Sequence, residues 1–436
     1  MSKPDYDFII MGAGVAGLYT ALKLHAKYPD KSIAIYEKHT APGGRISTWR
    51  DEGYQWECGA GRIALNHFLT MKLLQKYNLT TIPIGNNKEY IGPLHPPAEL
   101  PKTRRTGGAR RGTLYRGGAR RGTRKSDNSF HKIFDPLRDV FEHEMARVVK
   151  LAKTYTTTEL RATTLYKIAG RRGDILLASF GYNSELTVLN AYDALRQFKE
   201  LQYPNFYVVK EGLSVLIDNL VQELSQSGIT VHTEIGIQDY TTSKGIITVT
   251  LTNGETLRTP HLILAMNHTA LRKIPRLMTK FPAKIDSVIT QPLLRTYAVI
   301  PGGKKWLGTI PLTTSNPIRY IIPIDPDRGV YMISYTDGAD TEHWWKKGRS
   351  PEMLSKMIMR EIRNLFGKNV PDPVYFKDHY WKSGASYWTT GVNSDRIARK
   401  MLEIEPGVHI VGESYSHKQA WIEGALEQAE ALIDIL

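Results

Sequence analysis

A glycine-rich turn between an apolar strand and a helix is the feature that most constrains the fold of this chain. Residues 7–17 read DFIIMGAGVAG, and the helical pattern LYTALKL follows at once. In Gly12-x-Gly14-x-x-Gly17, Gly12 suits the tight turn, Gly14 lets backbone approach a pyrophosphate, and Gly17 allows close packing of helix and strand. The free N–H groups at the helix start, with Ala16 in its first turn, suit phosphate oxygens. This order of strand, turn and helix predicts a dinucleotide site.

The next apolar strand ends in an acidic residue that suits a ribose. Residues 33–36 read IAIY and are followed by Glu37 and Lys38. A carboxylate at this position can accept hydrogen bonds from the hydroxyls of a ribose. We therefore assign Glu37, with Lys38 beside it, to the nucleotide site. The alternative is a glycine turn in an ordinary α/β protein that binds no nucleotide.

The bulk composition excludes several classes of protein. A chain of 436 residues is long enough for two domains. No apolar run approaches the roughly 20 residues of a membrane span, and the first residues leave no room for a secretory signal, so we expect an intracellular, cytoplasmic location. The single cysteine, Cys58, excludes an internal disulfide, and the histidines lack the spacing of metal ligands, so no metal is expected.

One segment carries most of the positive charge. Residues 102–125 contribute +10 of the net charge of +15 and contain no acid. Within them GGARRGT occurs twice, ten residues apart. A segment so rich in glycine and charge, and so poor in apolar residues, is predicted to be a disordered loop. Such segments bind RNA and other polyanions through phosphate attraction; the alternative is a repeat expansion tolerated in a surface loop.

The remaining pattern predicts two interleaved domains. Residues 1–65, 205–270 and 395–436 each combine strands with a helix, whereas 66–204 look mainly helical and 271–394 form a mixed sheet with a helix. We predict an α/β fold with a Rossmann-like nucleotide domain built from those three pieces, plus an α+β substrate-binding domain built from the other two. Helices are predicted at 66–77, 135–153, 183–200, 214–227 and 351–366, and strands include 230–234, 246–251 and 261–265.

A second glycine-rich motif follows Glu37. In Pro42-Gly43-Gly44-Arg45 the glycines let backbone approach a ligand, and the Arg45 guanidinium offers phosphate two donors in a fork. With the motifs above, Glu211-Gly212-Leu213 before a helix, and the C-terminal segments Gly412-Glu413 and 420–425, this set resembles the flavin-dependent amine oxidases. Its motifs are most similar to those of L-amino acid oxidases. The resemblance spans almost the whole chain apart from 102–125.

The resemblance implies FAD as the cofactor. The residues that it assigns to FAD are Gly12, Gly14, Ala16, Gly17, Glu37, Lys38, Gly44, Arg45, Gly61, Arg62, Ile235, Trp381, Gly412, Glu413, Trp421 and Ile422. Ser386 stands where monoamine oxidases have the cysteine bonded to the flavin. The FAD is therefore expected to be noncovalent.

The resemblance also implies the chemistry. The flavin takes a hydride equivalent from the carbon that bears the amine, the imine is hydrolysed, and molecular oxygen reoxidises the flavin and gives hydrogen peroxide. In this family two aromatic rings usually sandwich the amine. Trp421 matches one of them; Tyr387 is the better candidate for the other, with Trp388 as the alternative. Core packing is the structural alternative for each ring.

Arg62 narrows the substrate. In Glu57–Ile63, ECGAGRI, the arginine stands where L-amino acid oxidases hold the substrate carboxylate. A guanidinium fork matches a planar carboxylate, whereas a simple amine would leave the charge unpaired in a dry pocket. This favours an amino acid over a polyamine. The alternative is that Arg62 binds flavin or a structural carboxylate.

Two departures from the family pattern concern the catalytic set. Arg295 stands at the usual position of a lysine that holds a water for flavin reoxidation, so oxygen reactivity is expected to be lower. The tyrosine that would help Arg62 hold the substrate carboxylate aligns near Ile322. Either Tyr320 substitutes for it, or the carboxylate clamp is incomplete.

The leading hypothesis is therefore oxidative deamination of a primary amine, in particular an L-amino acid, with Arg62, Tyr387, Trp421 and Arg295 as the catalytic set. The enzymatic alternatives are a polyamine or monoamine oxidase, or a flavin dehydrogenase or desaturase. The alternative outside enzymes is a nucleic-acid or polyanion-binding protein that works through residues 102–125.

Overall fold

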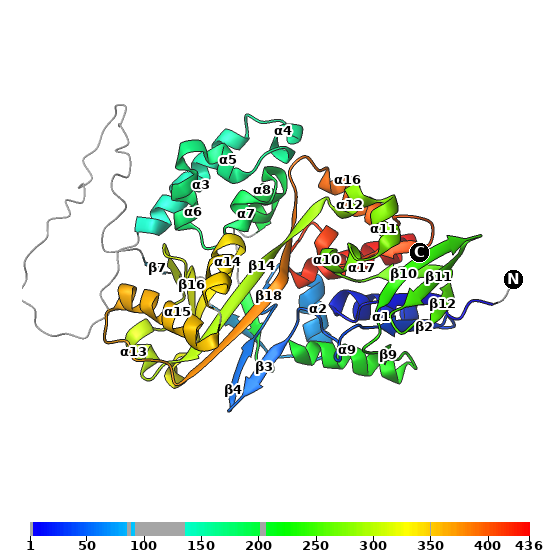
Figure 1. Cartoon of the computed structure of the whole chain (residues 1–436), viewed down its shortest axis with the longest axis horizontal. Coiled ribbons are helices and arrows are strands. Elements are labelled where there is room, and N and C mark those ends of the chain that lie inside the picture. The colour runs from blue at the N-terminus through cyan, green and yellow to red at the C-terminus, as the bar shows by residue number, and fades with distance from the viewer. Residues whose placement is uncertain (1–2, 85–88, 92–135, 201–205, 349) are drawn as a thin grey trace, which may run out of the picture.

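The computed structural model describes residues 3–84, 89–91, 136–200, 206–348 and 350–436. The basic repeat at 102–125 lies outside the described residues. Two large sheets, three smaller ones and a block of helices make up most of the described part (Figure 1). The two termini of the chain lie at the same end of the molecule (Figure 1).

A five-stranded parallel sheet gathers strands from three distant parts of the sequence. Its order is β19 (Val408–Ile410), β13 (His261–Leu264), β1 (Phe8–Met11), β2 (Ile33–Tyr36) and β9 (Val231–His232). The central strand β1 is buried on both faces, as a parallel sheet requires. Strands from 1–65, 205–270 and 395–436 therefore share one sheet, which supports the three-piece nucleotide domain as we propose it.

The alternation of side chains along β1 builds two separate cores. Phe8 and Ile10 point into a cluster formed with three helices, α1 (Val15–Lys27), α9 (Ser214–Gln226) and α17 (Ile422–Ile435). Ile9 and Met11 point to the opposite face, where Tyr240 and Val249 of an antiparallel sheet pack. That sheet consists of β10 (Ile237–Ser243), β11 (Ile246–Leu251) and β12 (Thr256–Thr259).

The second large sheet has six strands. Its order is β18 (Tyr375–Trp388), β14 (Val288–Val299), β17 (Val330–Asp337), β16 (Tyr320–Asp325), β15 (Leu312–Thr314) and β7 (Glu89–Ile91). Helices α13 (Gly303–Leu307), α14 (Gly338–Lys347) and α15 (Pro351–Phe366) accompany it, and Trp344 and Ile358 pack into its core. The long strand β18 was not predicted, because its sequence YFKDHYWKSGASYW mixes charged and aromatic residues without a regular apolar alternation.

The helical block corrects one prediction. It contains α3 (Pro136–Ala152), α4 (Thr157–Arg161), α5 (Leu165–Ala169), α6 (Gly173–Ser179), α7 (Ser184–Thr187) and α8 (Ala191–Glu200). The single helix predicted over 183–200 is wrong, because the chain breaks at Asn190. The amide N–H of Asn190 donates to the carbonyl of Trp388 at 3.1 Å, and its side-chain oxygen accepts from the N–H of Asp193 at 3.0 Å. Such local bonding by an asparagine favours a new helix start.

Other short elements complete the frame of the site. The segment after Arg45, predicted only as a loop, contains a hairpin of β3 (Thr48–Asp51) and β4 (Tyr54–Glu57). Strand β8 (Phe206–Val209) pairs with β5 (Ile63–Ala64) and β6 (Thr81–Ile84) in a small sheet of its own. The described helices also include α2 (Phe68–Lys76), α10 (His268–Leu271), α11 (Pro275–Lys280), α12 (Pro282–Ile285) and α16 (Ser394–Met401).

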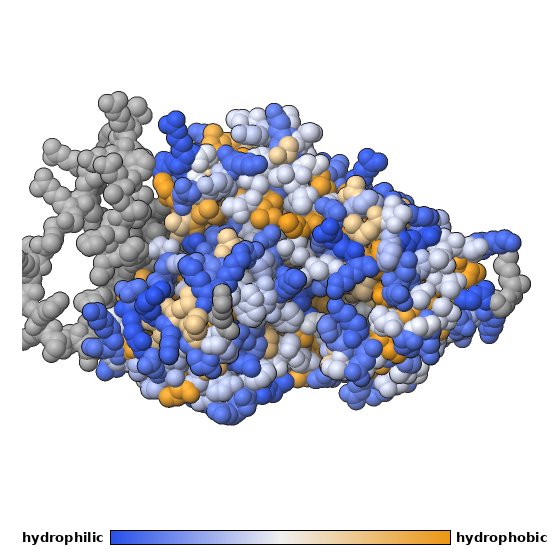
Figure 2. Space-filling model, viewed as in Figure 1, coloured by the Kyte–Doolittle hydropathy of each residue, from blue (hydrophilic) through white to orange (hydrophobic). Residues whose placement is uncertain are grey.

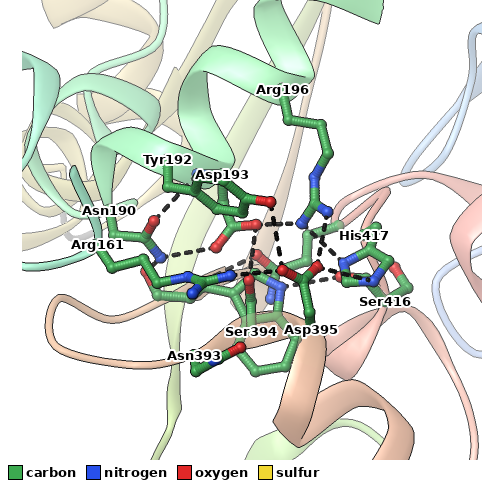
Figure 3. A network of polar contacts seen from close by, with 12 residues as sticks. Arg161, Asn190, Tyr192, Asp193, Arg196, Asn393, Ser394, Asp395, Ser416 and His417 are labelled. Atoms are coloured by element: carbon green, nitrogen blue, oxygen red, sulfur yellow. Dashed lines mark hydrogen bonds and ion pairs between the residues drawn. The ribbon is translucent and has the colours of Figure 1, made fainter. Parts of the chain in front are cut away.

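A polar network ties the helical block to the C-terminal piece of the nucleotide domain (Figure 3). Asp395 at the start of α16 binds Arg161 of α4 at 2.5 Å and Arg196 of α8 at 3.1 Å. Asp193 of α8 also pairs with Arg196 and accepts from the Ser394 hydroxyl at 3.0 Å. The block is therefore held against the nucleotide domain by charged side chains from both.

Candidate active site

The glycines of the β1–α1 turn divide into two packed positions and one open one. A Cβ on Gly12, at φ +111°, would lie 2.5 Å from the Ala265 carbonyl oxygen, and one on Gly17 would lie 2.0 Å from the oxygen of Gly12. A Cβ on Gly14 would meet nothing within 4 Å. Gly12 and Gly17 thus let the turn pack closely, while Gly14 faces space that a ligand can fill.

The start of α1 is free to bind an anion. Gly14 is the N-cap, no side chain caps the helix, and its first turn, which includes Ala16, has no acidic residue. The second glycine motif lies beside it, because the Gly43 N–H donates to the Ala13 carbonyl at 2.9 Å and Gly44 lies against Gly14. Uncapped N–H groups and the helix dipole favour phosphate here.

Glu37 lies at the edge of the same turn. Its carboxylate accepts from the backbone N–H of Ala13 and of His39, each at 2.9 Å. A carboxylate has about four acceptor positions, so capacity for ribose hydroxyls remains. Ile235 donates its N–H to the Glu37 carbonyl at 2.9 Å, and Lys38 is exposed next to it. Three of the predicted cofactor residues are thus neighbours.

Arg45 and Glu413, predicted separately as cofactor residues, form an ion pair of 2.6 Å. The Arg45 guanidinium also donates to the Gly384 carbonyl at 3.1 Å. Glu413 follows Gly412, whose φ of +126° favours glycine, and it accepts from the Ser386 hydroxyl at 2.9 Å. Ser386, at the position of the flavin-bonded cysteine, is therefore part of a hydrogen-bond network.

The Glu413 carboxyl is buried and yet stays charged. Burial alone would raise its pKa, but the Arg45 guanidinium and the hydrogen bonds from Ala420 and Ser386 outweigh burial and lower it. Breaking this pair would leave a buried charge without a partner, which typically costs about 3–5 kcal/mol. The pair therefore fixes the C-terminal segment against the motif that contains Arg45.

Arg62 projects into a cluster of tyrosines. Its guanidinium donates to the Tyr182 hydroxyl at 2.7 Å and lies 5.3 Å from the ring centroid of Phe206. The Tyr182 ring in turn contacts those of Tyr320 at 4.8 Å and Tyr335 at 5.2 Å. Among the described residues, no carboxylate pairs with Arg62. The Arg62 guanidinium therefore retains donors for an anionic ligand.

Arg295 lies in the same cluster. Its guanidinium donates to the Glu57 carbonyl at 3.1 Å and to the Tyr335 hydroxyl at 3.3 Å, and its side chain is buried. Gly61 lies beside it, but a Cβ there would crowd the Glu57 side chain, at 3.0 Å, more than the Arg295 guanidinium. Two of the predicted catalytic residues, Arg62 and Arg295, are thus gathered around Tyr335 and Tyr182.

Both guanidinium groups remain charged, although Arg295 is buried and Arg62 half-buried. Burial alone would lower the pKa of Arg62 and of Arg295, but the surrounding tyrosine oxygens oppose this effect, and the net shift is upward. Burial also raises the pKa of Tyr182 above its ordinary value, so its hydroxyl stays protonated at neutral pH. The cluster thus presents fixed positive charge next to neutral phenols.

The two aromatic candidates on β18 point to opposite sides. Trp388 is fully buried, and its indole N–H donates to the Ser416 carbonyl at 3.0 Å. Tyr387 is buried as well, and burial followed by the charge of Asp337 raises its pKa. Both rings belong to one buried core cluster, and Tyr387 as the residue that faces substrate stays a prediction.

Trp421 immediately precedes α17. Its ring stacks on Phe206 with centroids 6.0 Å apart and meets His67 edge-on at 4.9 Å. The residue before it, Ala420, has a φ of +66°, a strained value for alanine, and its N–H is held by Glu413 at 2.8 Å. Phe206 thus joins Trp421 to Arg62, but among the described residues no ring contact pairs Trp421 with Tyr387 or Trp388.

The last two predicted cofactor residues occupy different settings. Trp381 donates its indole N–H to the Cys58 carbonyl at 2.8 Å, and its ring lies against Gly59. Ile422 begins α17 and is buried in the core shared with α1.

Four residues of the site were missed from the sequence: Tyr182, Tyr335, Phe206 and His67. Tyr182 lies between α6 and α7, and no local pattern there indicates that it would meet a residue 120 positions earlier.

The comparisons with known proteins agree with this geometry. Residues 15–431 match the model of the flavin containing amine oxidoreductases. The chain belongs to this family. FAD is accordingly its cofactor, and the open Gly14 position, the uncapped α1 and Glu37 fit that group.

Several relatives of this amine oxidoreductase cover nearly all of it. An L-amino-acid oxidase of Siganus canaliculatus is 23% identical over 97% of this chain and 83% of the relative. An uncharacterized protein, R188, of Acanthamoeba polyphaga mimivirus is 23% identical over 98% and 93%. Among solved structures, putrescine oxidase bound to putrescine superposes with a TM-score of 0.72 at 15% identity, covering 99% of this chain and 98% of that one. These structures establish the fold.

The described residues contain neither a metal-binding cluster nor a membrane-spanning helix. In the part of the chain that the structure describes, no group of three or more histidine, cysteine or acidic side chains could hold a metal ion. Within the same residues, no helix is long and apolar enough to span a bilayer.

Proposed function

We propose that this amine oxidoreductase deaminates an L-amino acid. The overall reaction converts the amino acid, oxygen and water into a keto acid, ammonia and hydrogen peroxide. The observation that carries the proposal is the Arg62 guanidinium, which is bonded to Tyr182 at 2.7 Å and, among the described residues, has no carboxylate partner. The Arg62 side chain is half-buried; a partly desolvated cation without a counterion favours an anionic partner, and a substrate carboxylate supplies one.

Each residue of the site has a part in this reaction. Bound FAD supplies the two-electron oxidation of the carbon that bears the amine. Arg62 binds the substrate carboxylate through its remaining N–H groups, while the Tyr182 hydroxyl fixes the guanidinium. Tyr387 and Trp421 supply aromatic surfaces that exclude water and orient the amine. Arg295 keeps a second positive charge near the carboxylate.

A polyamine is the second candidate, because solved putrescine oxidases share the fold at TM-scores of 0.72 to 0.74. The charges in the tyrosine cluster argue against it. Arg62 and Arg295 are both cationic, and the charge of Arg295 acts to lower the pKa of Arg62. A substrate with two ammonium groups would meet like charge there, and desolvation would strengthen the repulsion.

The test measures peroxide release by the flavin-loaded protein over a panel of L-amino acids, D-amino acids, monoamines and diamines. We expect turnover of one or more L-amino acids and none of the corresponding amines that lack a carboxylate. Absence of turnover for every compound would contradict an oxidase. A parallel assay with an artificial electron acceptor identifies a dehydrogenase, the alternative that Arg295 favours over the usual lysine.

Two further proposals accompany this function. We propose an intracellular location, which localisation of a tagged chain would test. The prediction that residues 102–125 contact a polyanion also stands as a proposal and lies outside the described residues. Deleting the segment should abolish any salt-sensitive RNA binding and leave peroxide release unchanged.

A further inference from the structure

A surface groove of about 870 Å³ lies away from the tyrosine cluster, between α12 and α16. Its polar lining includes Lys284 of α12 and Arg396, Arg399 and Lys400 of α16. Its volume is in the range of small-molecule sites. Over α12 and α16 the molecular surface combines hydrophilic with weakly hydrophobic residues (Figure 2).

The groove gathers positive charge without neutralising it. Its lining includes four cations and no acid, and among the described residues none of the four pairs with a carboxylate. The nearby acids are already engaged, Asp395 by Arg161 and Arg196 and Asp286 by Arg272 at 3.1 Å. The local excess of charge is therefore available to a ligand.

The arrangement on α16 is not that of a scattered surface charge. Arg396 is three residues before Arg399 and four before Lys400, so the three share one face of the helix. Like charges at this spacing repel each other, so the helix bears a small cost that a bound anion would remove. Lys284 adds a fourth charge from the facing helix.

We propose that this groove binds a small organic polyphosphate, with a nucleoside triphosphate as the representative ligand. Two guanidinium forks and two ammonium groups suit several phosphate oxygens at once, whereas a single carboxylate would leave most of this charge unmatched. Ala283, Val392 and Ile397 supply apolar surface for a flat organic part. The cations surround one groove instead of following a stripe, which favours a compact ligand over a nucleic-acid strand.

The test is calorimetric titration of the flavin-loaded chain, in which the dinucleotide site is filled. The probes are ATP, inorganic triphosphate and adenosine. We expect ATP to bind more tightly than triphosphate, adenosine not to bind, and added salt to weaken both phosphate ligands. If triphosphate binds as tightly as ATP, the apolar contacts contribute nothing and the organic-ligand part of the proposal is wrong.

Charge reversal locates the site. The double variant Arg396→Glu, Arg399→Glu should raise the dissociation constant for ATP at least about tenfold. The matched control, Lys347→Glu with Lys368→Glu, makes the same change in net charge at exposed lysines elsewhere and should leave it unchanged. Flavin absorbance and thermal melting check that both variants are folded.

Three outcomes would overturn the proposal. They are no heat with either phosphate ligand, equal weakening in the control variant, and loss of ATP binding when residues 102–125 are deleted. Binding of a single-stranded oligonucleotide without binding of ATP would also contradict it, and would identify the groove as a nucleic-acid surface instead.

Discussion

At the scale of single residues, the decisive feature is the Arg62 guanidinium, which has N–H donors left for an anionic ligand. Arg62 was predicted from sequence because its motif is local, but its hydroxyl partner was not. From the sequence, the tyrosine that would help Arg62 hold the substrate carboxylate aligns near Ile322, with Tyr320 as a substitute, whereas the Arg62 hydrogen bond at 2.7 Å is made by Tyr182. Tyr320 lies one ring further away. Tyr182 lies between α6 and α7, and no local sequence pattern pairs such a residue with Arg62.

Removing the guanidinium tests the substrate class. Arg62→Ala should lower kcat/KM for an L-amino acid about 100-fold, because a charge-assisted interaction of about 3 kcal/mol is lost. Steady-state peroxide assays measure this, and Arg62→Lys should recover part of the loss because it keeps the charge without the fork. Unchanged amino-acid turnover in Arg62→Ala would contradict the proposed role.

Removing the Tyr182 hydroxyl tests whether this residue positions the Arg62 guanidinium. Tyr182→Phe should raise KM roughly fivefold with little change in kcat, since a single hydrogen bond contributes about 1 kcal/mol. The matched variant Tyr320→Phe should have a smaller effect. The proposed role of Tyr182 would be wrong if the two variants behaved alike.

At the scale of elements, the sequence pattern predicted helices and strands that depend on neighbouring residues. It did not predict elements that depend on contacts with distant segments. The strand, turn and helix at 7–27 were predicted because their hydrophobic pattern and glycines are contiguous. The break at Asn190 was missed because it depends on Trp388, nearly two hundred residues later. Strand β18 was missed because its burial comes from β14 on one side and from its contacts with the C-terminal segment.

The sheet element β19 makes the protein sensitive to acid. His409 on β19 is buried, its Nδ1 lies 2.7 Å from the Leu402 carbonyl, and burial lowers its pKa to about 4. The unfolded chain binds a proton near pH 6.5, so stability falls as the pH drops from about 6.5 toward 4, by at most about 3 kcal/mol.

Thermal melting at several pH values measures this effect. His409→Asn, whose amide can still donate to Leu402, should melt with a weaker dependence on pH between these limits than the parent protein. An identical pH dependence in both proteins would show that His409 does not contribute. His67 and His379, whose pKa values burial also lowers to about 4, account for the dependence that remains.

At the scale of the whole molecule, charged side chains hold the helical block against the nucleotide domain (Figure 3). Asp395 contacts Arg161, Arg196 and, at 3.5 Å, His417. Because the block supplies Tyr182, its position governs the substrate side of the site. These ion pairs could not be predicted from the sequence, because their residues come from four separate segments.

Asp395→Asn should weaken the contacts between the helical block and the nucleotide domain, because it removes the charge that pairs with Arg161 and Arg196. We expect faster hydrogen exchange in α4 and α8 and a higher KM, with the flavin content unchanged. Asp434→Asn, which alters an exposed carboxylate of α17, is the control. Equal exchange in the two variants would mean that packing alone positions the block.

The parallel sheet also has a consequence for the order in which the protein is made. Its central strand β1 leaves the ribosome long before β19, which lies at one edge of the sheet. The hydroxyl of Tyr19 bonds to Glu430, 411 residues later. Contacts of such separation close slowly. The nascent chain must therefore keep a glycine-rich turn and apolar strands without their full set of partners until β19 has been synthesised, and assembly of the complete cofactor site follows that step.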